Sequence, residues 1–101
     1  MRIVKIEIMK KFHDTGRIIC TRLITERSKD DYTFKQWINE CLLRYFVCDW
    51  GDLGTDDKKM NDTGITSGDR ILAKYKNLSG DIFIITEADR SYTTILFTEE
   101  Y

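Results

Sequence analysis

The sequence predicts a single α+β domain, spanning residues 1–101, in which strands at both ends flank a helical middle. Three observations lead to this fold class. Residues 2–9 alternate between apolar and charged side chains, residues 33–47 carry apolar side chains at helical spacing, and short apolar runs follow after residue 70. A chain of 101 residues fits one ordinary domain and is too short for two.

The N-terminal part is predicted to form a β-hairpin. Val4, Ile6 and Ile8 fall on one side of the first strand, with charged side chains on the other. A polar cluster at residues 13–16 is typical of a turn, and the β-branched run at residues 17–24 is predicted as the second strand.

A long amphipathic helix is predicted over residues 33–47. Its apolar positions follow one stripe, with Thr33 and Gln36 as a capping box at its start. The stripe consists of Phe34, Trp37, Ile38, Cys41, Leu42 and Tyr45. A short second helix is predicted over residues 56–62, capped by Thr55 and ended by Gly64.

The last third is predicted as an antiparallel meander. Its strands are residues 70–76, 81–86 and 92–97, joined by short polar turns. The middle strand is apolar at consecutive positions, which indicates that both of its faces are covered. Together with the N-terminal hairpin, these strands give about five strands, mainly antiparallel, packed with one long and one short helix.

Composition favours a soluble cytosolic protein. Hydrophobic residues make up 42% of the chain, enough for a core, and no apolar stretch has the length of a secretory signal or a membrane span. An odd number of cysteines, Cys20, Cys41 and Cys48, without C-x-x-C spacing, indicates reduced thiols.

The residues that could perform catalysis are few. His13, the one histidine, lies in a predicted turn and lacks a partner for metal binding or for general-base chemistry. The acids between residues 49 and 62 do not follow the spacing of a calcium loop, and there is no glycine-rich phosphate loop. The sequence therefore predicts a binding protein that is not an enzyme, with no metal, cofactor or small-molecule substrate.

Charge is unevenly distributed along the chain. Residues 1–48 hold ten Lys and Arg against six Asp and Glu, whereas residues 49–101 hold six against eleven. The basic half supports one alternative function, a nucleic-acid-binding regulator. Its cations include Arg17, Arg22, Arg27 and Lys29, although the overall pI of about 5.8 makes this a weak footprint.

Two polar segments are candidate contact sites, and each has a structural alternative. Trp50, between acids, either plugs the core beneath its loop or is an exposed anchor for a partner. The turn at residues 87–90 either binds its own backbone through Asp89 and pairs Arg90 with a nearby acid, or forms a polar contact patch.

The C-terminal two thirds, roughly residues 34–101, resemble a family of small bacterial phage and plasmid proteins without assigned activity. The resemblance lies in the linked order of several motifs. They are Asp49-Trp50-Gly51-Asp52-Leu53, Asp57, Asn61-Asp62, Gly68-Asp69-Arg70-Ile71-Leu72, the run of residues 84–90, the run of residues 93–97 and Glu99-Glu100-Tyr101.

This resemblance implies an origin in a mobile genetic element and a place in the cytosol of the bacterial host. Small proteins of such elements are often stoichiometric inhibitors, so the expected function is inhibition of a defence complex such as CRISPR–Cas, through a protein partner. The expected contact residues are Asp49, Trp50, Asp52, Asp56 and Asp57, followed by Glu87, Asp89 and Arg90.

Overall fold

The computed structural model describes residues 13–101. Its elements in chain order are β1 (Arg17–Cys20), α2 (Arg22–Asp30), α3 (Tyr32–Phe46), α4 (Thr55–Ser67), β2 (Ile71–Tyr75), β3 (Ile82–Thr86), β4 (Tyr92–Phe97) and the 3₁₀ turn η1 (Thr98–Glu100). The α+β class is therefore confirmed, with three α-helices and a four-stranded sheet in the described part of the chain.

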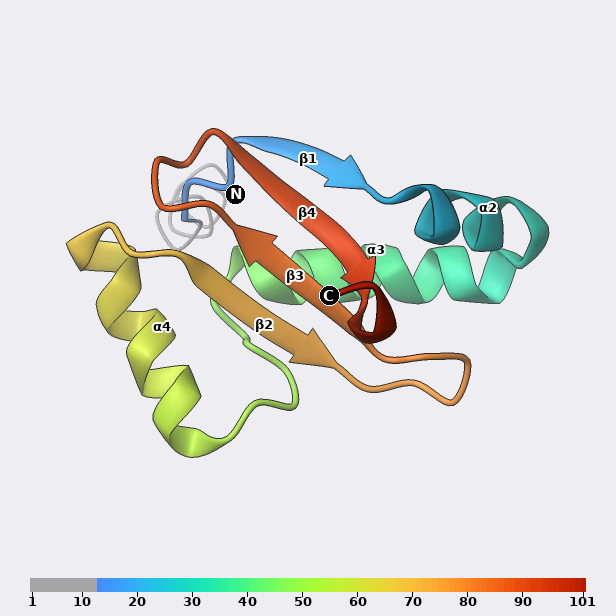
Figure 1. Ribbon diagram of the computed structural model, residues 1–101. Coiled ribbons are helices and arrows are strands. Elements are labelled where there is room, and N and C mark those ends of the chain that lie inside the picture. The colour runs from blue at the N-terminus through green and yellow to red at the C-terminus, as the bar shows by residue number, and fades with distance from the viewer. Residues whose placement is uncertain (1–12) are drawn as a thin grey trace, which may run out of the picture.

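The sheet is mixed, with the strand order β1-β4-β3-β2. Strands β2, β3 and β4 form the predicted antiparallel meander, and β1 pairs with β4 in parallel. Figure 1 shows α3 crossing behind the sheet and α4 standing beside β2. The opposite face of the sheet, toward the viewer, has none of the described helices over it.

The predicted N-terminal hairpin is corrected in part. Its first strand, residues 2–9, lies outside the described residues. Its second strand ends at Cys20, because Thr21 begins a helix: the Thr21 hydroxyl accepts the backbone N–H of Ile24. The prediction of a strand through residue 24 was wrong, and α2 was missed.

Helix α3 confirms the predicted long helix and its apolar stripe. Asp31 caps it, accepting the N–H of Phe34 at 3.0 Å, so the predicted capping box at Thr33 was wrong. Four stripe residues are buried, and the other two pack against the core at its margin. The buried four are Phe34, Ile38, Cys41 and Tyr45.

Helix α4 is longer than the predicted short helix. Gly64, expected to end it, lies inside, where a Cβ would come within 2.9 Å of the Ile71 side chain. The helix ends instead at Gly68, whose φ of 80° is the left-handed conformation that glycine adopts readily. The buried glycine thus lets α4 lie close against β2.

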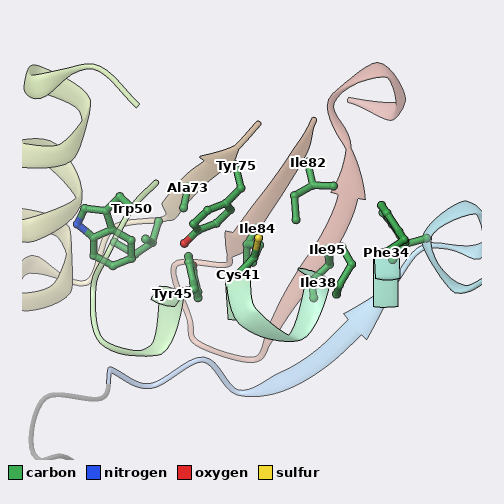
Figure 2. Packing of buried hydrophobic residues seen from close by; sticks show 12 residues of the cluster. Phe34, Ile38, Cys41, Tyr45, Trp50, Ala73, Tyr75, Ile82, Ile84 and Ile95 are labelled. Atoms are coloured by element: carbon green, nitrogen blue, oxygen red, sulfur yellow. The ribbon is translucent and has the colours of Figure 1, made fainter. Parts of the chain in front are cut away.

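The core lies between α3 and the sheet (Figure 2). Alternate residues of the strands point toward α3, including Ala73, Tyr75, Ile84 and Ile95. One polar chain crosses it. Tyr45 Oη lies 2.5 Å from Thr86 Oγ1, Thr86 Oγ1 lies 2.6 Å from Thr93 Oγ1, and Thr93 donates to the carbonyl of Thr15.

Candidate partner-binding surface

Asp49 follows α3 and is held by Arg44. Two hydrogen bonds join the guanidinium to the carboxylate, at 2.8 and 3.2 Å, and the carboxylate also accepts the N–H of Gly51. Donation from Arg44 lowers the pKa of Asp49 below its ordinary value. Asp49 therefore remains charged while it fixes the turn that leaves the helix.

Trp50 lies in the core. Trp50 is 2% exposed, and its ring meets that of Tyr45 edge-on at 5.4 Å between centroids (Figure 2). It also meets the ring of His13 edge-on, again at 5.4 Å between centroids. The indole Nε1 donates to Asp62 at 2.9 Å. The core-plug alternative is confirmed, and Trp50 is not an exposed anchor, because the loop folds its ring inward onto α3.

Gly51 and Asp52 cover the outer edge of β2. Gly51 forms a parallel bridge with Lys74, and the N–H of Asp52 donates to the Lys74 carbonyl at 2.7 Å. A Cβ on Gly51 would lie 2.2 Å from that carbonyl oxygen, and its φ is 73°, so glycine is needed here. The Asp52 carboxylate accepts the N–H of Lys76.

Asn61 completes the cover of the same edge and was missed as a key residue in the sequence. This buried side chain on α4 donates to the carbonyl of Leu72 at 2.8 Å and accepts its N–H at 3.3 Å. It thus bonds the backbone of β2 as a neighbouring strand would. Its sequence signal was slight, since an Asn within a polar helical segment is ordinarily exposed.

The turn at residues 87–90 is also largely structural. Asp89 accepts the N–H and hydroxyl of Ser91, as the turn alternative predicted. Arg90 donates to the carbonyl oxygens of Gly64 and Asp69, at 3.0 and 2.7 Å, where an acid was expected as its partner. Its guanidinium therefore ties this turn to the C-terminal end of α4.

The predicted contact residues lie at opposite ends of α4. Asp56 and Asp57 are exposed in its first turn, while Arg90 binds at its last, and thirteen residues of helix span roughly 20 Å. Figure 1 shows these two ends of α4 well apart. The structure therefore does not gather the eight predicted residues into one patch.

A groove between α4 and β2 contains one of them, Asp57. This hollow of about 420 Å³, the α4 groove, lies on the face of the sheet away from α3. Its apolar lining comes from Leu53, Met60 and Leu72, and its charged lining from Asp57, Asp69 and Arg70. Met60 is 70% exposed, so a flexible apolar side chain stands at the rim.

Arg70 links the α4 groove to the face of the sheet turned away from α3. It donates to the hydroxyl of Tyr101 at 2.9 Å and lies 4.0 Å from the Glu87 carboxylate. The Tyr101 ring, whose residue is 65% exposed, meets Phe83 of β3 edge-on at 5.4 Å. Asp57, Arg70, Glu87 and Tyr101 thus border one continuous surface.

The cations of the N-terminal half are dispersed. Arg22 pairs with Glu26 on α2, and Arg27 lies over the rings of Phe34 and Phe97 while donating to the Ser79 carbonyl. Arg17 is the first residue of β1, at the end of the strand that is farther along the chain from α2. These three arginines therefore do not lie together on one face of the kind that nucleic acids need.

Other chemistry has few groups to draw on. Within residues 13–101, no three His, Cys, Asp or Glu side chains could hold a metal ion together, and no helix is long and apolar enough to cross a membrane. All three cysteines are free, and burial raises the pKa of Cys41 to about 12. His13, expected to be exposed, is half-buried against Tyr45 and Trp50.

These features define a small α+β protein with a mixed sheet, one face covered by α3, and a second face over which the described residues place no α-helix, bordered by a groove. No family model, curated protein or solved structure matches the chain. The resemblance to phage and plasmid proteins therefore stays a prediction.

Proposed function

We propose that this protein is a non-catalytic binding protein of a mobile genetic element, which acts as a stoichiometric inhibitor of a bacterial defence complex such as CRISPR–Cas. The main observation in support of a binding surface is the α4 groove, which has the exposed Met60 in its lining. Arg70, also in that lining, donates to the exposed Tyr101 and so extends the surface beyond the groove. The identity of the partner rests on the resemblance in the sequence.

The distribution of polar side chains supports binding at this groove. Asp49, Asp52, Asp89 and Arg90 already hold backbone or ion-pair partners inside the protein. Asp57 is exposed beside Met60 at the groove. Exposed apolar side chains with a charged rim are typical of protein contact surfaces.

The experiment is a pull-down from a lysate of a CRISPR-bearing bacterial host, with the tagged chain as bait. We expect recovery of a defence complex at fixed stoichiometry, lost in the variants Met60→Glu and Tyr101→Ala. Leu43→Glu is the matched control, because Leu43 is nearly as exposed as Met60 and Tyr101 but lies on α3. Recovery of no defence component, or equal recovery with all variants, would contradict the proposal.

A nucleic-acid-binding regulator is the alternative function. It predicts that the protein binds duplex DNA with an affinity that falls steeply as salt rises from about 50 to 200 mM. Measured by fluorescence anisotropy, such binding without a protein partner would replace the inhibitor proposal.

A further inference from the structure

The inner side of β1 is incompletely covered by the described helices. Ile18 and Cys20 pair with Thr93 and Ile95 of β4, and so point to the same side of the sheet as α3. Both are nevertheless exposed. Between β1, α2 and α3 lies a hollow of about 310 Å³, called here the β1 hollow.

The β1 hollow has a mixed lining. Its apolar residues include Cys20 and Ile38, and its uncharged polar residues are Thr25, Ser28 and Asn39. This volume is near the lower bound of about 300 Å³ for small-molecule sites, which typically combine an apolar lining with a few polar groups.

Two ammonium groups give the hollow its charge. Lys29 from α2 and Lys35 from α3 both line it, and no acidic residue among residues 13–101 does. Neither lysine side chain has an ion pair or hydrogen bond within residues 13–101. An anion entering the hollow would therefore meet positive charge without a competing carboxylate.

The other hollows have the opposite charge. Four acids and one arginine line the hollow between α2 and η1, namely Glu26, Asp30, Glu99, Glu100 and Arg27. Two aspartates and one arginine line the α4 groove. Charge complementarity thus assigns an anion to the β1 hollow specifically.

We propose that the β1 hollow binds a small amphipathic anion, with its apolar body over Cys20 and Ile38 and its anionic head between Lys29 and Lys35. Partial desolvation raises the pKa of Cys20, so at neutral pH its thiol is uncharged and does not repel an anion. This site lies apart from the α4 groove, so it stands or falls independently of the proposed function.

Cys20 provides the readout. Iodoacetamide, an uncharged reagent, alkylates exposed thiols, and peptide mass spectrometry separates Cys20 from the half-buried Cys48, which is an internal reference. The probes are octanoate, inorganic phosphate and 1-octanol at equal concentration. We expect octanoate to slow alkylation of Cys20 relative to Cys48 several-fold, and the other two probes to leave it unchanged.

Matched variants test the head group. In Lys29→Gln/Lys35→Gln, the octanoate dissociation constant should rise about fivefold or more, the size expected for losing two exposed charge contacts. Lys59→Gln, an exposed lysine on α4, should leave it unchanged. Circular dichroism confirms that each variant is folded.

Each other outcome overturns the proposal. Equal protection by phosphate means that an adventitious anion only is bound. Equal protection by octanol means an apolar surface without charge recognition. Absence of protection by octanoate, or unchanged affinity in the double lysine variant, removes the site itself.

Discussion

The guanidinium of Arg90 donates to three carbonyl oxygens, those of Gly64, Asp69 and Glu87. Its backbone has φ = 61°, a left-handed conformation that costs a non-glycine residue roughly 1–2 kcal/mol. Hydrogen bonds from a charged donor contribute about 1.5–3 kcal/mol each. The side-chain contacts therefore outweigh the backbone strain, which accounts for an arginine at a position that favours glycine.

His13 is the residue whose protonation should affect stability near neutral pH. Its Nε2 lies 3.1 Å from the carbonyl oxygen of Tyr45, while its buried Nδ1 has no partner within the described residues. Burial lowers the pKa of His13 below 6.5, and the nearby Arg90 acts in the same direction. The neutral ring is therefore the form that the fold accepts.

We predict that the free energy of unfolding falls as the pH drops below about 6.5. Between the native and the unfolded pKa, the unfolded chain binds a proton at His13 that the native protein does not. The contribution of His13 is complete above pH 6.5 and is lost as the pH falls through its native pKa. Urea unfolding at about pH 7.5 and 5 measures this difference.

The variant His13→Gln is the control, because glutamine can donate to Tyr45 but does not titrate in this range. Its stability should change less between the two pH values than that of the wild type. The carboxylates with lowered pKa, Asp49 and Asp89, act only at lower pH. Equal pH dependence of both proteins would contradict the assignment to His13.

At the scale of elements, α3 supplies most of the helical part of the core. We predict that Ile38→Ala lowers the free energy of unfolding by about 2–5 kcal/mol, because it leaves a cavity between α3 and the sheet. Leu43→Ala, at a 61% exposed position of the same helix, should change it by less than about 0.5 kcal/mol. Denaturant titration compares the two, and similar losses would refute the packing.

The elements that could be predicted from sequence are those with a strong local period. The stripe from Phe34 to Tyr45 and the alternating runs of the meander each bury one face, so their patterns follow directly from packing. The run at residues 17–24 was predicted as one strand because its β-branched residues continue into α2. The strand ends earlier because Thr21 caps the helix. A local pattern does not show such a switch.

For the candidate binding surface, the sequence identified polar residues but could not show which of them bond inside the protein and which face outward. Trp50 and Asp62 meet only through the folding of α4 beside β2, and Asn61 bonds Leu72 through the same contact. The α4 groove likewise combines residues from two elements distant along the chain. These relations depend on tertiary contacts, for which a single sequence has no period.

At the scale of the whole molecule, strand pairing brings the first and last strands of the described chain together. Strand β1 pairs in parallel with β4, so residues 17–20 lie beside residues 92–95. The hydroxyl chain of Tyr45, Thr86 and Thr93 reinforces this joint by linking α3, β3 and β4 to the carbonyl of Thr15. Both threonines are fully buried. The chain therefore couples four segments through three fully buried side chains.

We predict that Thr86→Val and Thr93→Val each lower the free energy of unfolding by about 1–3 kcal/mol, since each leaves buried polar atoms without partners. The double variant should lose less than the sum by at least about 0.5 kcal/mol, because the second substitution removes a hydroxyl already deprived of its neighbour. Thr94→Val, on the opposite face of β4, is the control and should be near neutral. Strict additivity in denaturant titrations would show that the two hydroxyls contribute separately and not as one coupled chain.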